Sequence, residues 1–64
     1  MIDSDYRARR AKLVNEFLHM KKLRLYRSAA ARVRQIAELD FKFDGTPVEK
    51  TKAIFYYDQL TKNT

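Results

Sequence analysis

The segment KKLRLYRSAAARVR, residues 21–34, carries six positive charges and no carboxylate, and the apolar pattern changes phase within it. Upstream, one stripe recurs at spacings of three and four residues: Tyr6, Arg10, Leu13, Phe17 and Met20. Downstream, the next apolar set consists of Ala29, Val33, Ile36 and Ala37. The two sets are out of phase by about two residues, so a straight helix would turn its second half away from the first half's core. We therefore predict a break in residues 23–28.

The periodicity on both sides of this break predicts an all-α fold. We expect three short helices, at residues 5–22, 29–40 and 47–61, in one small domain that spans residues 1–64. An alternative is a short strand at residues 22–27 that precedes the last two helices, because apolar and polar residues alternate there. A strand followed by two helices is the order found in ribbon-type DNA-binding dimers.

Local signals mark where the second and third helices begin. Ser28 precedes three alanines and is predicted to cap the second helix, because a serine side chain can accept a hydrogen bond from a first-turn N–H. The only glycine and the only proline, Gly45 and Pro47, predict a turn before the third helix. Thr46, Pro47 and Glu49 have the spacing of a capping box with proline at the first helical position.

The third predicted helix is rich in aromatic residues. One of its faces carries Ala53, Tyr56, Tyr57 and Leu60, and Phe55 points roughly the other way on an ideal helix. A helix that is apolar on more than one side is buried on more than one side, or it presents a patch to a partner. Aromatic residues also suit a strand paired with residues 39–43, but the capping signals favour a helix.

The length of 64 residues limits what the chain can bury, so a single core is marginal and self-association is expected. The chain has no Cys and one His, which argues against disulfides, thiolate metal sites and a multi-His metal site. No segment approaches the ~20 apolar residues of a membrane span. The first ten residues lack the order of a signal peptide. We expect a cytoplasmic protein, associated with the nucleoid if it binds DNA.

The positive charge is concentrated in the first half of the chain. The net charge is +6, and residues 6–37 contain ten Lys or Arg against the single acid Glu16. Residues 38–64 contain four Lys against five acids. Within the basic half arginine outnumbers lysine by seven to three. Because arginine binds phosphate in a bidentate manner and stacks on bases, this composition favours a nucleic-acid partner.

Enzymatic chemistry is not expected. One glycine cannot supply a glycine-rich phosphate loop. The lone His19 lies on a charged helix face, and no Cys is available to pair with it. The carboxylates are scattered among lysines, and a chain of this size can hardly build the cleft that a pair of catalytic acids needs. We therefore expect no catalytic residues, no metal and no cofactor.

The favoured interpretation is a small basic regulatory protein that binds DNA or RNA through phosphate contacts. The candidate nucleic-acid-binding residues are Lys21, Lys22, Arg24, Arg27, Arg32 and Arg34. Two tyrosines of the basic half, Tyr6 and Tyr26, could stack on a base, although Tyr6 also fits ordinary packing on the apolar stripe.

The alternative is a protein-interaction module, such as an inhibitor or adaptor of a larger protein machine. It would dock through the aromatic third helix, and its basic half would steer it to an acidic protein. The candidate residues for this interface, or for a homo-oligomer interface, are Phe55, Tyr56, Tyr57 and Leu60.

Overall fold

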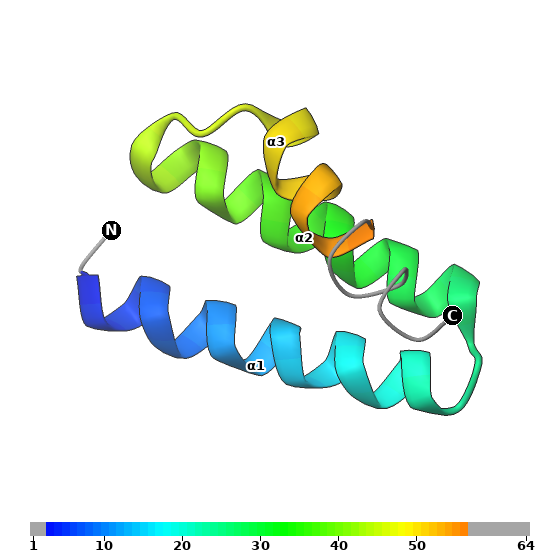
Figure 1. Ribbon diagram of the computed structural model, residues 1–64. Helices are drawn as coiled ribbons and strands as arrows, with labels where there is room; N and C mark the ends of the chain where they lie inside the picture. Colours follow the sequence, from blue (N-terminus) through cyan, green and yellow to red (C-terminus); the bar gives the residue numbers. More distant parts are fainter. Residues whose placement is uncertain (1–2, 57–64) are drawn as a thin grey trace.

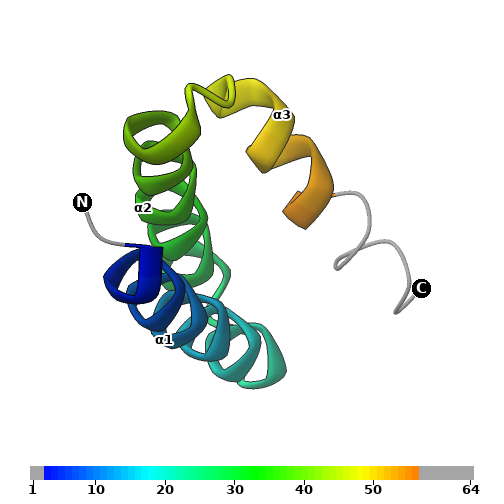
Figure 2. The same cartoon turned by 90° about the vertical axis from the view of Figure 1, so that its left-hand side faces the viewer.

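The protein is a helical hairpin with a third helix packed on it (Figure 1). The computed structural model describes residues 3–56, which form α1 (Asp3–Lys22), α2 (Tyr26–Asp44) and α3 (Val48–Ala53). A π-helical turn at residues 54–56 follows α3. In Figure 2, α1 and α3 approach α2 from different sides. The all-α prediction is confirmed. None of residues 3–56 lies in a strand, so the strand alternatives for residues 22–27 and for the third segment are wrong.

The core forms where the two predicted apolar sets meet. Phe17 of α1 is fully buried, as are Val33 and Ile36 of α2. The Phe55 ring, which follows α3, meets the Phe17 ring edge-on at a centroid distance of 5.3 Å. Ala29 completes this cluster, and partly buried residues of α1 surround it: Leu13, Val14 and Met20. The predicted phase of both helices is therefore confirmed, since all four predicted apolar residues of the second helix are buried.

The break between α1 and α2 is shorter than predicted. Only residues 23–25 lie outside the helices, and Ser28 lies in the first turn of α2 instead of capping it. The N-cap residue is Leu25, and it makes no side-chain capping hydrogen bond. The chain can reverse within three residues because the backbone of Arg24 adopts a left-handed conformation, which the sequence pattern did not indicate.

The turn before α3 is where predicted, but its hydrogen bonds differ. α2 continues to Asp44, beyond the predicted end at residue 40, and stops at Gly45 in the left-handed conformation. The predicted capping box is wrong, since Pro47 is the N-cap and makes no side-chain capping bond. Thr46 instead donates its hydroxyl and its backbone N–H to Asp44 Oδ1, the latter at 3.0 Å. These bonds hold the pKa of Asp44 below its ordinary value.

None of the described helices combines the length and the apolar composition that crossing a bilayer requires.

Candidate nucleic-acid interface

A buried carboxylate, Asp40 of α2, joins all three helices. Its Oδ1 accepts hydrogen bonds from the Tyr6 hydroxyl at 2.7 Å and from Arg10 Nε at 3.0 Å. Its Oδ2 accepts from Arg10 Nη2 at 3.3 Å and from the Thr51 hydroxyl at 3.1 Å. We call these four residues the Asp40 network. Because none of its buried side-chain polar atoms lacks a hydrogen-bond partner, the network can be buried without leaving an unpaired charge.

The Asp40 network also involves the aromatic core. The Arg10 guanidinium lies 5.7 Å from the centroid of the Phe55 ring. Tyr6 stacks on Phe43 with ring centroids 3.9 Å apart. The hydrogen bond from Arg10 to Asp40 raises the pKa of the guanidinium above its ordinary value. Burial, followed by the hydrogen bond to Asp40, raises the pKa of the Tyr6 hydroxyl. These residues therefore hold the helices together and leave Arg10 little capacity for an external anion.

Sequence reasoning placed Tyr6 and Arg10 on the buried stripe but did not identify Asp40. A signal was present, because Asp40 continues the buried series Val33, Ile36 and Ala37 at helical spacing. A carboxylate in a core register needs a cationic or hydroxyl partner in another element. Arg10 stands in the equivalent register of α1.

The hairpin tip, which we define as residues 22–27, connects α1 to α2 at the right of Figure 1. The N–H of Leu25 donates to the Met20 carbonyl at 2.8 Å, and the N–H of Arg24 donates to the Lys21 carbonyl at 3.0 Å. These two bonds form a Schellman motif, whose left-handed position is usually a glycine. Here that position is Arg24, with a φ of 63°. Arg24 is the only non-glycine residue with positive φ among those described.

The hairpin tip gathers three of the six predicted cationic residues. Lys22, Arg24 and Arg27 are all exposed. Arg34 is also exposed and lies two turns from Arg27, which places both on the same side of α2, roughly 10 Å apart along the axis. Within residues 3–56, no carboxylate forms an ion pair with Arg24, Arg27 or Arg34. No acid occurs anywhere in residues 17–37, so the segment that carries the tip is cationic throughout, and the first acid after it, Glu38, follows Arg34 by one helical turn.

The other two predicted residues do not join this group. Arg32 is half-buried, and its Nε lies 2.8 Å from Glu16 Oε1 of α1. This ion pair lacks hydrogen-bond geometry, since the buried Nε atom has no hydrogen-bond partner within the described chain. Lys21 is half-buried at the end of α1. Three arginines of the basic half are thus paired with the protein's own acids: Arg7 with Asp3, Arg10 with Asp40 and Arg32 with Glu16.

The tip also exposes apolar side chains between its cations. Leu23, Leu25 and Tyr26 are 54%, 50% and 57% exposed. Tyr26 is the first residue of α2, and its exposure shows that it does not pack in the core. The first turn of α2 contains no acidic residue, so the positive end of its helix dipole adds to the charge of the tip.

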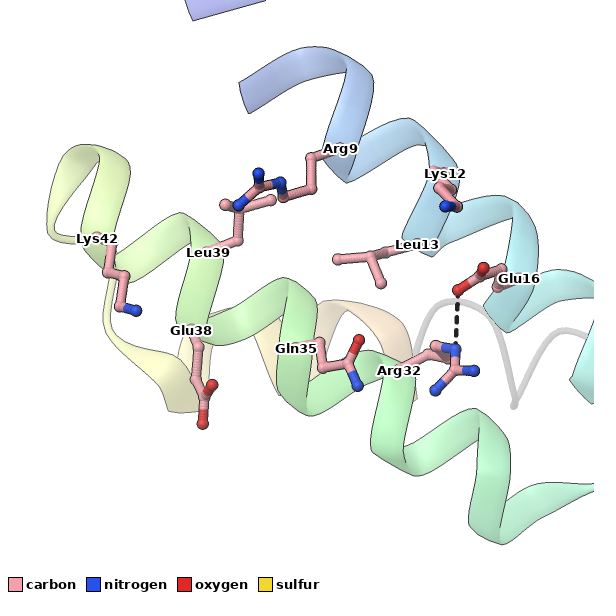
Figure 3. A pocket seen from close by; sticks show the side chains of 9 residues that line it. All are labelled: Arg9, Lys12, Leu13, Glu16, Arg32, Gln35, Glu38, Leu39 and Lys42. Carbon is pink, nitrogen blue, oxygen red and sulfur yellow. Dashed lines mark ion pairs between the residues drawn. The ribbon is translucent and has the colours of Figure 1, made fainter. Parts of the chain in front are cut away.

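A groove of about 500 Å³ lies between α1 and α2, away from the tip (Figure 3). Its charged lining is mixed, with four cations and two acids: Arg9, Lys12, Arg32, Lys42, Glu16 and Glu38. The Arg32–Glu16 ion pair closes one end of it (Figure 3). Because each acid offsets a cation, the groove favours anions much less than the tip does.

The predicted interface on the third helix is divided by the fold. Phe55 is 5% exposed and belongs to the chain's own core, so it offers little surface to a partner. The sequence pattern set Phe55 roughly opposite the face of Ala53 and Tyr56 and did not decide which of the two sides packs. In the structure Thr51 and Phe55, one helical turn apart, face inward together, and the Thr51 hydroxyl donates a hydrogen bond to Asp40. Tyr56 is exposed, whereas Tyr57 and Leu60 lie outside the described residues.

Among the described residues, no three His, Cys, Asp or Glu side chains gather closely enough to hold a metal ion. Comparison with known proteins adds no relative: no family model, no curated protein and no solved structure matches this chain.

Proposed function

We propose that the protein is a small non-enzymatic regulator that binds nucleic acid through the hairpin tip and the adjoining Arg34. The observation that carries the proposal is that three exposed arginines at the tip and beside it, Arg24, Arg27 and Arg34, form no ion pair with a carboxylate of residues 3–56. Each guanidinium is free to form paired hydrogen bonds with a phosphate, and Lys22 adds a fourth charge. A protein with this function would work in the cytoplasm, at the nucleoid if the bound nucleic acid is DNA.

The position of Arg24 supports this role. A left-handed residue other than glycine carries a backbone cost of about 1 kcal/mol. Nothing in the described chain offsets that cost through the Arg24 side chain, which is exposed and forms no ion pair with a carboxylate. A ligand contact made by the Arg24 side chain would explain why a cationic residue occupies this strained, exposed position.

The test is a titration of labelled duplex and labelled single strand with the purified protein at two salt concentrations. With four phosphates neutralised, the log–log slope of affinity against salt should be about −3 to −4. Replacing Arg24, Arg27 and Arg34 by Ala together should remove most of the binding measured at ~50 mM salt. Retained affinity in this triple variant would refute the proposed function.

Two single substitutions serve as controls. Arg7→Ala removes the same charge from the opposite end of α1, roughly 20 Å from the tip, where Arg7 pairs with Asp3. It should change affinity little. Arg32→Ala breaks the Glu16 pair and leaves the tip intact, so it should weaken binding far less than the loss of a tip arginine. Circular dichroism of every variant establishes that the helices are retained.

A second candidate function is a protein-interaction module or a homo-oligomer that uses the exposed side of the segment after α3. Ile54 and Tyr56 are 44% and 36% exposed, which favours this surface over the predicted set that included Phe55. The solution mass, measured for the protein and for Ile54→Ser with Tyr56→Ser, tests self-association. A pull-down from nuclease-treated lysate separates this function from nucleic-acid binding. If the protein is an interaction module, the pull-down should recover an acidic protein partner.

A further inference from the structure

We infer that the hairpin tip binds unpaired nucleotides, in DNA or RNA, by stacking a base on Tyr26. This inference rests on the proposed function and specifies the class of nucleic acid. Tyr26 lies between Arg24 and Arg27, is 57% exposed, and begins α2. Its ring contacts no other described aromatic ring, in contrast with Tyr6 on Phe43 and Phe17 on Phe55.

The apolar surface around Tyr26 distinguishes a single strand from a duplex. Leu23 and Leu25 are each about half exposed beside the tyrosine. A duplex presents phosphates on its outside and keeps base faces stacked within, so these apolar groups would find no exposed base face on it. An unpaired strand offers its base faces, and aromatic side chains flanked by cations are the usual way in which proteins bind them.

The cations are arranged to support such a contact. Arg24 is two residues before Tyr26 and Arg27 is directly after it, so phosphates on either side of a stacked base would meet a guanidinium. Because residues 17–37 contain no acid, the segment that carries Tyr26 has no carboxylate of its own to repel the strand. Charge complementarity therefore points to a polyanion, and the exposed ring and leucines point to one with accessible bases.

The experiment compares three probes: a labelled oligothymidylate, a labelled oligouridylate and a duplex of equal length. The wild-type protein should bind at least one single strand more tightly than the duplex. Tyr26→Ala should lower single-strand affinity roughly tenfold or more, while duplex affinity changes by less than about twofold. Tyr26→Phe keeps the stacking ring and should bind like the wild type. The two single strands distinguish DNA from RNA.

Phe41→Ala is the matched control, because Phe41 is 56% exposed on the same helix, far from the tip. It should leave all affinities unchanged. Equal single-strand and duplex affinity, with the arginine dependence retained, would overturn this inference and leave the proposed function standing. An equal loss for both probes in Tyr26→Ala would also overturn it. If neither nucleic acid binds, both proposals fail, and binding to vesicles that contain phosphatidylglycerol would then assign the tip to an anionic lipid surface.

Discussion

At one end of the α1–α2 hairpin, Arg10 lies against a carboxylate, and at the other end Arg24 extends into solvent. Arg10 bonds to both oxygens of Asp40, whereas no acid among residues 3–56 pairs with Arg24. α2 ends directly before Gly45 and α1 ends two residues before Arg24, and the backbones of Gly45 and Arg24 are both in the left-handed conformation. The same residue type thus stabilises the fold at one end and is left available at the other, and the number of arginines alone does not measure the binding surface.

The largest effect on stability is expected from Asp40→Ala, which changes the Asp40 end of the hairpin and not the tip. It removes the shared acceptor of Tyr6, Arg10 and Thr51 and leaves a partly buried guanidinium without its partner. The free energy of unfolding should fall by about 3 kcal/mol, which is a large part of the stability of so small a domain. Urea denaturation followed by circular dichroism measures the change. Asp40→Asn keeps the shape and part of the hydrogen bonding, so it should be less harmful.

The contrast between the ends predicts that Asp40→Ala leaves the tip itself unaltered. Under conditions where the variant is still folded, its nucleic-acid affinity should equal that of the wild type. A selective loss of affinity in the folded variant would mean that the Asp40 network also shapes the binding surface.

The next effect is expected from Tyr6→Phe, which removes a hydrogen bond to a carboxylate and should cost about 1.5 kcal/mol at neutral pH. Because the pKa of Tyr6 is raised on folding, its contribution is complete below its ordinary pKa of 10.0 and declines as pH rises above it. The wild type should therefore lose stability on alkaline titration more steeply than Tyr6→Phe. Parallel alkaline profiles would contradict the assigned role of this hydroxyl.

The smallest effects on stability are expected from single substitutions at Gly45 and Arg24, the two left-handed residues that follow helices. Gly45→Ala should destabilise the protein by about 1 kcal/mol, through backbone strain alone, since a Cβ at Gly45 meets no atom within 4 Å. Arg24→Gly relaxes the strain at a φ of 63° and should stabilise the protein by about 0.7 kcal/mol. Thermal denaturation measures both changes.

Arg24→Gly should at the same time weaken nucleic-acid binding and reduce the steepness of its salt dependence by about one unit. Stability and affinity therefore change in opposite directions at this position. A variant that is more stable and binds as tightly as the wild type would show that Arg24 is not a phosphate contact.

Four properties could be predicted from the amino-acid sequence: the helical periodicity, the phase of Phe17 and of the series from Ala29 to Ala37, the turn at Gly45, and the excess charge of the first half. These properties depend on local spacing and composition, which a single sequence displays directly. Three further properties became visible only in the folded chain: Asp40 meets Arg10 across thirty residues, Thr51 and Phe55 form the buried face of the third segment, and within residues 3–56 some arginines are paired with acids while others are not. Those outcomes depend on which side chains come within bonding distance between helices, and spacing along the chain does not encode that distance.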